Sequence, residues 1–531
     1  MAKKILLLII LTIPAFALML RPGIYTMHDF HVFRQYEFDK CTAEGIFPCR
    51  WAPDAGLGYG EPLFNYYGQL PYWLGTIFRL SGFPVLDSVK SVFILSLVLS
   101  GISMYLLAKE FWGSDGALVS ALFYTYAPYR AVDVWVRGAL PEALSFVFFP
   151  LILLFIEKKK YLLFSFSLFL LLITHNLSLF MFLPFMGIWW LVRSWDWKFI
   201  PAGLLSLVLS SFYLLPVIFE SNLVTLTQTT AGYYDYSLHW TTLSQLFLSR
   251  FWGYGGSNWG PNDTMSFSIG HLHWIIALVV VPFAFLVKKS KKHIIPTSLF
   301  VILALIALFL THGKSEVFWK IIPGLPFVQF PWRFLSMSTF FLSLTAGVLT
   351  KLFSPKLTLI FSSTFLLLLS ANFFGPDIWL NLNDTQYFSG KLWDEQRSSA
   401  LSDFWPKSAP RLPQSFAPSL PSISAGDGFV SIAHFSAHSG NYRLFIQSQS
   451  ALTIFPQVFF PGWTSIVDGI EQKVLIQPET GLIALDVPQG WHDIRLEFKD
   501  SFVRLMGNLV SSLTLLSAGS WLILAKKKYR A

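Results

Sequence analysis

The 531-residue sequence contains few charged residues and only two cysteines. Charged residues make up 13% of the chain, whereas hydrophobic residues make up 54%, and the mean hydropathy is +0.54. This composition excludes a soluble globular domain and indicates a membrane protein with many spans. The net charge of +9 does not indicate a nucleic-acid partner, because the basic residues stand in short clusters at the ends of apolar segments.

Both cysteines, Cys41 and Cys49, lie between the first two apolar segments. Their spacing lacks the partner ligands of a zinc site. A disulfide could form if this part of the chain faces an oxidising compartment, and two free thiols fit the sequence equally well. No internal repeat is visible, and no small-x-small cleavage pattern follows the apolar segment 5–20, which we therefore expect to remain as a span.

The apolar segments predict about twelve transmembrane helices with both termini in the cytoplasm, because a span needs about 20 apolar residues and basic residues favour the cytoplasmic ends. The basic runs that set this orientation include 158–160, 288–292 and 526–530. The stretch 63–80 is predicted as an interfacial or re-entrant helix, because counting it as a span would place 158–160 outside. The predicted spans are 5–20, 88–108, 116–135, 143–156, 161–174, 177–192, 199–219, 271–287, 294–310, 333–350, 357–374 and 503–525.

The region 375–502 differs from the rest of the chain, because its residues alternate with the period of a β-strand. Tyr442, Leu444 and Ile446 alternate with Arg443, Phe445 and Gln447, and Asp468-Gly469 predicts a hairpin turn. A Ser/Pro-rich linker at 408–424 precedes these strands. We therefore predict a mainly α membrane protein with a C-terminal, external, β-sandwich-like domain. Its parts are a transmembrane domain at 1–374 with external loops at 21–87 and 220–270, the β-rich domain at 375–502, and a last span with a basic tail at 503–531.

Asp29 is the central candidate for chemistry, because it follows the first span by about nine residues and stands beside His28. A carboxylate at the membrane surface could act as a general base for a hydroxyl nucleophile or could hold a divalent cation. The alternative is a helix N-cap, since Asp is favoured where a helix begins. The same loop also contains His31, Arg34 and Glu61.

Five stretches of the sequence carry a resemblance to known families. They are HDFHVFR, GIFPCRWAPDAGLGYGEPLFNYYGQLPY, APYRAVDVWVRGALPEAL, THNLS and QFPWRF. They resemble the bacterial membrane proteins called 6-pyruvoyl-tetrahydropterin synthase-related. More broadly, the chain resembles the multispan glycosyltransferases of the GT-C class, which include oligosaccharyltransferases, protein mannosyltransferases and aminoarabinose transferases. In that class an acidic residue of the first external loop activates the acceptor or binds a metal, and Asp29 matches its position.

The class resemblance implies a polyprenyl-phosphate sugar donor, whose departing phosphate needs cationic or hydrogen-bonding partners. Arg137 and Arg333 lie at the outer ends of predicted spans, against the usual cytoplasmic bias, and are candidates for that role. Snorkelling to lipid headgroups is the alternative for each. His175 could bond the phosphate or could satisfy carbonyls of a tight turn. Asp133 and Glu142 flank Arg137 and could simply pair with it.

The resemblance implies an integral membrane hexosyltransferase of GT-C type in the bacterial cell envelope. It would transfer a sugar from a polyprenyl-phosphate donor to a glycan, lipid or protein acceptor on the outer face of the cell membrane. The alternative is a lipid or oligosaccharide transporter or flippase without catalytic activity, but the spans are almost free of charge and show no related halves. The predicted site residues are Asp29 and His28 for catalysis, Arg137, Arg333 and His175 for the donor phosphate, His31, Arg34, Glu61 and Glu142 as further candidates, and Asp29 for a divalent cation if one binds.

Overall fold

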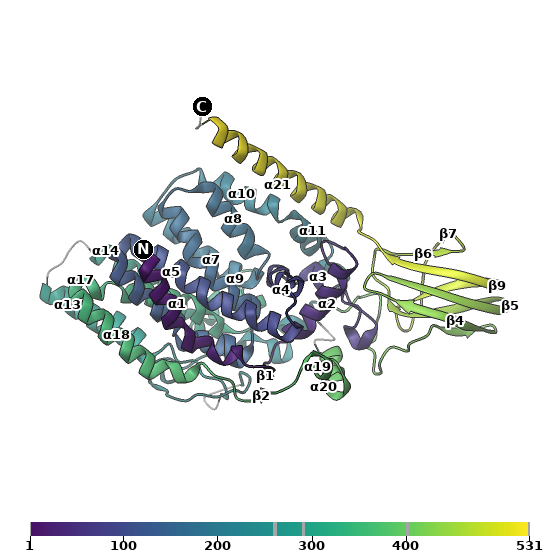
Figure 1. Cartoon of the computed structure of the whole chain (residues 1–531), viewed down its shortest axis with the longest axis horizontal. Coiled ribbons are helices and arrows are strands. Elements are labelled where there is room, and N and C mark those ends of the chain that lie inside the picture. Colours follow the sequence, from purple (N-terminus) through teal and green to yellow (C-terminus); the bar gives the residue numbers. More distant parts are fainter. Residues whose placement is uncertain (1, 259–262, 289–292, 400–402, 529–531) are drawn as a thin grey trace. The chain divides into compact units, whose positions relative to one another are not determined.

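The computed structural model describes residues 2–258, 263–288, 293–399 and 403–528 (Figure 1). The chain divides into two compact units whose segments interleave along the sequence. The first unit comprises Met1–His31, Trp73–Ser206 and Thr229–Asp384, and the second comprises Val32–Tyr72, Leu207–Gln228 and Thr385–Ala531. The side chains of the basic runs 288–292 and 526–530 lie outside the part of the chain that the structure describes.

The described residues include eight helices that are long and apolar enough to cross a membrane, or nine if the bent pair Phe199–Leu209 and Ser211–Phe219 is one span. This supports a multi-pass membrane protein. Every predicted span is helical, but Tyr161–Leu172 and His271–Leu286 are shorter than the others. The predicted number of twelve spans is therefore not confirmed.

The first unit is helical apart from a two-stranded sheet of β1 (Ile24–Tyr25) and β2 (Trp379–Leu380). Most of its helices are rich in Leu, Phe and Ile. They are α1 (Ala2–Phe16), α5 (Val85–Thr125), α7 (Leu140–Glu157), α8 (Tyr161–Leu172), α9 (Asn176–Arg193), most of α10 (Phe199–Leu209), α12 (His271–Ile275) with η9 (Ile276–Val280) and α13 (Val281–Lys288), α14 (Ile294–Thr311), α15 (Glu316–Ile321), α16 (Leu335–Ala346), α17 (Leu349–Leu352) and α18 (Pro355–Ser370).

Helix α5 consists of two arms that fold back on each other at Gly113, where the backbone leaves the helical conformation. A Cβ atom on Gly101 would lie 3.1 Å from the Thr125 hydroxyl oxygen. In a straight helix these two residues would be about 36 Å apart, at about 1.5 Å per residue. The arms therefore correspond to the predicted spans 88–108 and 116–135. The second arm ends early, at Thr125, because Ala127 precedes a proline and is extended.

The most buried spans of the first unit are the second arm of α5, helix α7, and the run Pro331–Leu352 that contains α16. Helices α1 and α18, by contrast, have few buried residues. A charged side chain lies near one end of each buried span: Arg137 in the segment after α5, Glu142 in the first turn of α7, and Arg333 just before α16. These three buried charges therefore lie near ends of the central helices.

The stretch 63–80 forms two short helices, α3 (Leu63–Tyr66) and α4 (Leu70–Leu80), and neither is long enough to span a membrane. Cys41 and Cys49 form a disulfide, so the alternative of two free thiols is wrong. The helices that lie entirely or almost entirely in the second unit are α2 (His31–Ala43), α3, α11 (Ser211–Phe219), α19 (Asp384–Tyr387), α20 (Gly390–Ser398) and α21 (Phe502–Lys528).

The second unit also contains the predicted β-structure, an antiparallel sheet in the order β3-β5-β9-β6-β7, in which β4 pairs with β5 and β8 pairs with β9. The turn at Asp468-Gly469, where both φ angles are positive, joins β6 to β7 and confirms the predicted hairpin. The strands are β3 (Ser422–Ala425), β4 (Gly428–Phe435), β5 (Ser439–Val458), β6 (Trp463–Val467), β7 (Ile470–Gln472), β8 (Leu475–Ile476) and β9 (Leu482–Phe498).

Strands β5 and β9 are long and pair along most of their length, with register shifts after Ile446 and after Ile454. Strands β4 and β6 flank one half of this pair, and β3 and β8 flank the other. Leu444 and Leu496 from one half and Leu485 from the other belong to the same buried cluster. The region is therefore a single hydrogen-bonded sheet whose two halves share one core, and its inward residues include the predicted Tyr442, Leu444 and Ile446.

Candidate functional site

The short segment after α5 holds the loop that carries Asp29. This segment comprises α6 (Pro128–Ala131) and a π-helical turn, η3 (Val132–Arg137), followed by Gly138 at a φ of 65°. The Arg137 carbonyl accepts hydrogen bonds from the backbone N–H groups of both His28 and Asp29, each at 3.0 Å. A Cβ atom on Gly138 would lie only 2.4 Å from the Met27 Cβ, so glycine permits this close approach.

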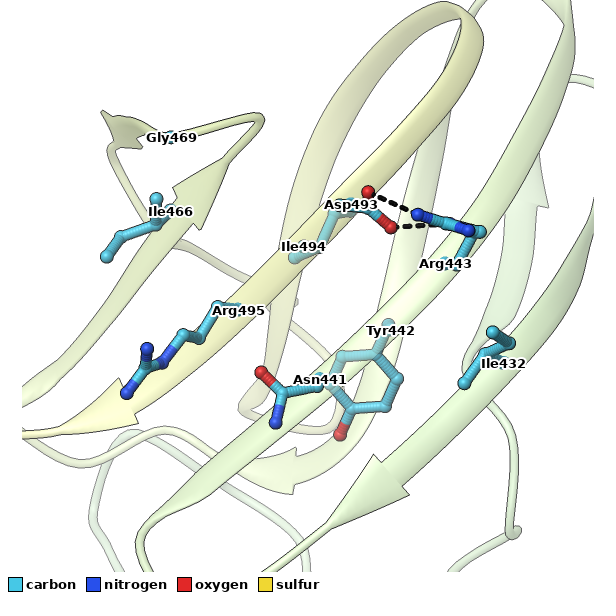
Figure 2. Close-up of a pocket in the computed structure, with 9 residues that line it drawn as sticks. All are labelled: Ile432, Asn441, Tyr442, Arg443, Ile466, Gly469, Asp493, Ile494 and Arg495. Atoms are coloured by element: carbon cyan, nitrogen blue, oxygen red, sulfur yellow. Dashed lines mark hydrogen bonds and ion pairs between the residues drawn. The ribbon is translucent and has the colours of Figure 1, made fainter.

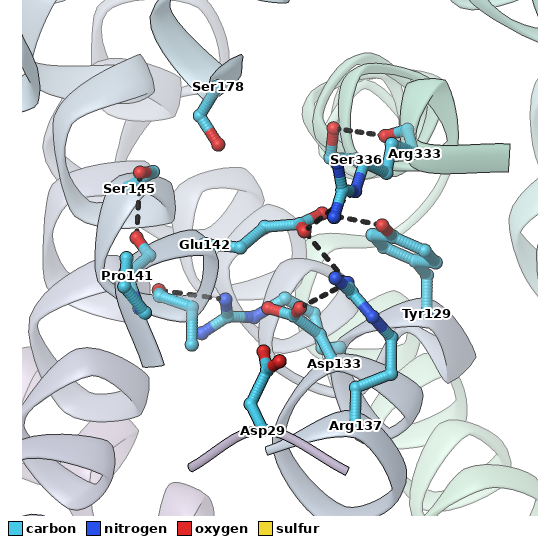
Figure 3. A network of polar contacts seen from close by, with 12 residues as sticks. Asp29, Tyr129, Asp133, Arg137, Pro141, Glu142, Ser145, Ser178, Arg333 and Ser336 are labelled. Atoms are coloured by element: carbon cyan, nitrogen blue, oxygen red, sulfur yellow. Dashed lines mark hydrogen bonds and ion pairs between the residues drawn. The ribbon is translucent and has the colours of Figure 1, made fainter. Parts of the chain in front are cut away.

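Two arginines and three acidic or phenolic side chains form a buried network, which we call the arginine network: Tyr129, Asp133, Arg137, Glu142 and Arg333 (Figure 3). Arg137 Nη1 donates to Asp133 Oδ1 at 2.9 Å and to Glu142 Oε2 at 2.7 Å. The Tyr129 hydroxyl donates to Glu142 Oε1 at 2.5 Å. Arg333 Nε lies 3.9 Å from Glu142 Oε2, so one carboxylate faces both guanidinium groups.

Aromatic rings and backbone carbonyls surround the two arginines. The Arg137 guanidinium lies 4.9 Å from the centre of the Trp332 ring, and the Arg333 guanidinium lies 5.0 Å from the centre of the Phe330 ring. Arg333 Nη1 also donates to the Val328 carbonyl at 2.9 Å and to Gln329 Oε1 at 3.0 Å. These contacts fix both guanidinium groups in a region of low polarity, where charge interactions are strong.

Burial and charge act in opposite directions on the network. Burial alone would lower the pKa of Arg137, but the carboxylate of Glu142 and that of Asp133 hold the pKa above its ordinary value. Burial and the neighbouring Glu142 raise the pKa of Asp133 well above its ordinary value. The carboxylate of Glu142 thus stands between the two guanidinium groups.

His175 lies beside the same charges, and its Nδ1 is 2.7 Å from the Ser178 hydroxyl. Burial lowers the pKa of His175 to about 4, and the cationic Arg333 and Arg137 act in the same direction. The imidazole is therefore neutral near pH 7. It can form a hydrogen bond to a ligand, but it does not add a positive charge.

The Asp29 side chain is 39% exposed, whereas its neighbour His31 is fully buried. Their closest polar atoms, Asp29 Oδ2 and His31 Nε2, are 3.6 Å apart. The charge of Asp29 acts on Asp133, Arg137 and Arg333, so the carboxylate lies close to the arginine network (Figure 3). Asp29 thus combines an accessible carboxylate with buried cationic neighbours.

His28 contacts the backbone rather than another candidate side chain. Its Nε2 is 2.9 Å from the Tyr254 carbonyl oxygen. The Tyr254 hydroxyl in turn donates to the Gly375 carbonyl at 2.9 Å. These contacts connect the segment before Asp29 to two later loops of the first unit, and they give His28 a positioning role in the structure.

Arg34 and Glu61 belong to the second unit, whereas Asp29 belongs to the first. The Arg34 guanidinium lies 4.3 Å from the centre of the Tyr67 ring and donates to its hydroxyl. Burial raises the pKa of Glu61 well above its ordinary value, and nearby Asp403 acts in the same direction. Of the predicted site residues, the structure thus brings together Asp29, His31, Arg137, Glu142, His175 and Arg333.

The described residues contain no group of three or more His, Cys, Asp or Glu side chains that could hold a metal ion. Asp133 and Glu142, the carboxylates of the arginine network, both face Arg137.

Tyr129 is the member of the arginine network that the sequence did not reveal. It is fully buried between α5 and α7, and its hydroxyl donates to the carboxylate that joins the arginines. Nothing in the APYR stretch, neither its spacing nor its charges, would have distinguished Tyr129 from the other aromatic residues of the sequence. Trp332 lies in the QFPWRF stretch beside Arg333 in the sequence, but its contact with Arg137 could not be read from that stretch.

Comparison with known proteins gives only distant matches. No protein-family model and no curated protein matches the chain, so membership of the 6-pyruvoyl-tetrahydropterin synthase-related family is not shown. The arabinofuranosyltransferase AftD from Mycobacteria matches over 73% of this chain and 28% of its own, with 13% identity and a TM-score of 0.47. The oligosaccharyltransferase of Archaeoglobus fulgidus, tethered with an acceptor peptide, matches over 80% of this chain and 61% of its own, with 11% identity and a TM-score of 0.42. Similarities this low carry no argument about activity.

Proposed function

We propose that this protein is a membrane glycosyltransferase of GT-C type, which transfers a sugar from a polyprenyl-phosphate donor to an acceptor hydroxyl at the outer face of the membrane. The observation that carries the proposal is the accessible carboxylate of Asp29 beside the buried Arg137–Glu142–Arg333 group. A lipid phosphate needs a cationic site next to an apolar environment, and a nucleophilic hydroxyl needs a nearby base. The multi-pass fold supplies the apolar environment.

Of the two arginines, Arg333 is the better candidate for the phosphate. Arg137 is already held by short ion pairs to Asp133 and Glu142. Arg333 Nε is buried and has no hydrogen-bond partner among the described residues, and the Glu142 carboxylate oxygen is 3.9 Å away, beyond hydrogen-bond distance. A phosphate oxygen would satisfy that N–H group. Arg137 then acts through Glu142, which it fixes in place.

In the proposed reaction, Asp29 accepts the proton of the acceptor hydroxyl as the hydroxyl oxygen attacks the anomeric carbon of the sugar. The new carbon–oxygen bond forms as the bond between that carbon and the phosphate oxygen breaks. The electron pair of the broken bond goes to the polyprenyl phosphate, whose developing charge Arg333 stabilises. His175 donates a hydrogen bond to the same phosphate. A single displacement inverts the configuration at the anomeric carbon.

The test is the variant Asp29→Asn. It is assayed in membranes supplied with polyprenyl-phosphate sugars and with an acceptor fraction obtained by lipid extraction. A general base raises a reaction rate by about 10²-fold to 10⁴-fold. The rate of polyprenyl phosphate release should therefore fall by at least about 10²-fold in this variant. The assay also separates transfer from transport, because a flippase moves the donor without releasing the phosphate.

The matched control is Asp115→Asn. Its side chain is 46% exposed, similar to Asp29, and it pairs with Lys4 at the other end of the helices. This control should transfer sugar at the wild-type rate. If Asp29→Asn reaches wild-type abundance and still releases polyprenyl phosphate at the wild-type rate, Asp29 is not the base and the proposed reaction is wrong.

A further inference from the structure

One face of the sheet in the second unit carries a row of exposed aromatic side chains. Phe429 of β4 pairs with Phe445 of β5, which pairs with Trp491 of β9. The Phe445 and Trp491 ring centres are 5.2 Å apart, and those of Phe429 and Trp491 are 5.6 Å apart. Trp491 is nevertheless 54% exposed and Phe429 is 49% exposed. Cross-strand aromatic pairs stabilise sheets, but burial would serve that purpose better than exposure.

Most of the neighbouring positions on the same face are polar. Arg443 pairs with Asp493 across β5 and β9, and its Nε and Nη2 donate to the two carboxylate oxygens at 2.6 and 2.7 Å (Figure 2). Beside this pair lies the exposed Ile432. One step further along the strands, Asn441 faces Arg495. Donors and acceptors thus follow directly after the aromatic row.

These side chains border two open depressions of about 450 and 420 Å³. Ile432, Arg443 and Asp493 line both of them, so the depressions form one continuous surface. Trp491 borders the smaller depression, and Asn441 and Arg495 border the larger. The surface offers an apolar end and a polar end to the same ligand. We call it the aromatic–polar face.

The charged groups of this face are paired. Arg443 is bound to Asp493, and Arg495 Nη2 lies 2.5 Å from Glu497. A nucleic acid or an anionic membrane surface would need an excess of basic side chains, and these pairs leave none. The chemistry fits an uncharged ligand that has both apolar surface and many hydrogen-bonding groups.

We propose that the aromatic–polar face binds an uncharged carbohydrate chain. A sugar ring has an apolar face of C–H groups, which packs on an exposed indole, and a rim of hydroxyls, which both donate and accept. Asp493 and Asn441 supply acceptors, and Arg443 supplies donors held in a fixed orientation by its ion pair. The function is binding alone, so it stands apart from the proposed transfer reaction and needs neither a donor lipid nor Asp29.

The experiment is affinity electrophoresis of the full-length protein in an amphipol, since maltoside detergents would themselves present sugars. The probes are amylose, β-glucan, mannan, galactan and arabinan, with heparin as an anionic comparison. We expect at least one neutral polysaccharide to retard the wild type, while heparin does not. Trp491→Ala should weaken that retardation by about tenfold or more, as expected for a central aromatic anchor. Trp491→Phe should restore part of it.

Two further variants guard against misfolding and separate binding from catalysis. Ile432→Asp adds an uncompensated charge to both depressions without touching the aromatic row, and it should also abolish retardation. Trp197→Ala removes a Trp that is 65% exposed in the first unit and should bind like the wild type, as should Asp29→Asn. The proposal is overturned if no neutral polysaccharide retards the wild type. Thermal unfolding shows whether Trp491→Ala and Ile432→Asp are folded. The proposal is also overturned if both variants are folded and bind the polysaccharide like the wild type, or change only in oligomeric state.

Discussion

Replacing Arg137 and Arg333 one at a time should separate stability from activity, although both arginines contact the same carboxylate. In Arg137→Met, the buried carboxylate of Glu142 loses its partner at 2.7 Å and Asp133 loses its partner at 2.9 Å. At an effective dielectric constant of about 20, the attraction across 2.7 Å is about 6 kcal/mol before desolvation. Breaking a buried ion pair costs about 3–5 kcal/mol net, and we expect a loss of stability of that size.

In Arg333→Met, Glu142 keeps both Arg137 and the Tyr129 hydroxyl. The variant loses the hydrogen bonds that Arg333 donates to the Val328 carbonyl and to Gln329. Their loss should lower the free energy of unfolding by about 1–3 kcal/mol. Transfer, however, should fall by about 10²-fold to 10³-fold, as when one group that stabilises a developing negative charge is removed. Arg333→Met should therefore be the more stable and the less active of the two folded variants.

The measurement is a denaturant titration of each variant in mixed micelles, together with release of polyprenyl phosphate. Arg193→Met is the control, because its partly exposed ion pair with Glu157 should contribute at most about 1 kcal/mol and nothing to transfer. Equal stability of the Arg137 and Arg333 variants would refute the assignment of Arg137 as the partner that neutralises Glu142. Full transfer by Arg333→Met would refute its role at the phosphate.

Two other predictions concern the loop and the imidazole beside the network. Gly138→Ala should displace Met27 and with it Asp29, so that transfer falls more than stability; Gly187→Ala, whose added Cβ would meet no atom within 4 Å, should leave transfer unchanged in the same assay. Because the pKa of His175 is about 4 in the folded protein and ~6.5 in an unfolded chain, the unfolded state binds more protons between these values. The unfolding free energy should therefore decrease as the pH falls through this window. In denaturant titrations at successive pH values, this decrease should be smaller for His175→Gln than for the wild type.

The sequence predicted the elements whose signals are local. Each apolar run became a helix, and Asp468-Gly469 became a hairpin turn because both positions favour positive φ. The number of crossings could not be counted in this way, because length alone does not distinguish a short span such as α8 from a helix that stays at the surface. The fold of α5 at Gly113 was predictable from Lys109, since a basic residue marks a cytoplasmic end.

The candidate site was only partly predictable, because the positions of charged residues along the sequence do not show which of them are neighbours in space. Arg137, Arg333 and His175 were conspicuous as polar residues at the ends of apolar segments, and they do lie together. Glu61 was equally conspicuous in the first loop, yet it belongs to the second unit. The role of Glu142 as the carboxylate between two arginines required the packing of α7 beside the segment before α16, which no local pattern encodes.

The Cys41–Cys49 disulfide bears on the side of the membrane that the first long loop faces. Disulfides persist in oxidising compartments and are rare in the cytoplasm, so the bond favours an external position for this loop. The distribution of lysines favours the same position, because Lys3, Lys4 and Lys109 flank the loop's two neighbouring spans at their far ends. One argument rests on thiol chemistry and the other on membrane insertion, so they are independent. Their agreement supports an outward-facing Asp29, since Asp29 lies in the same connection between the first two spans.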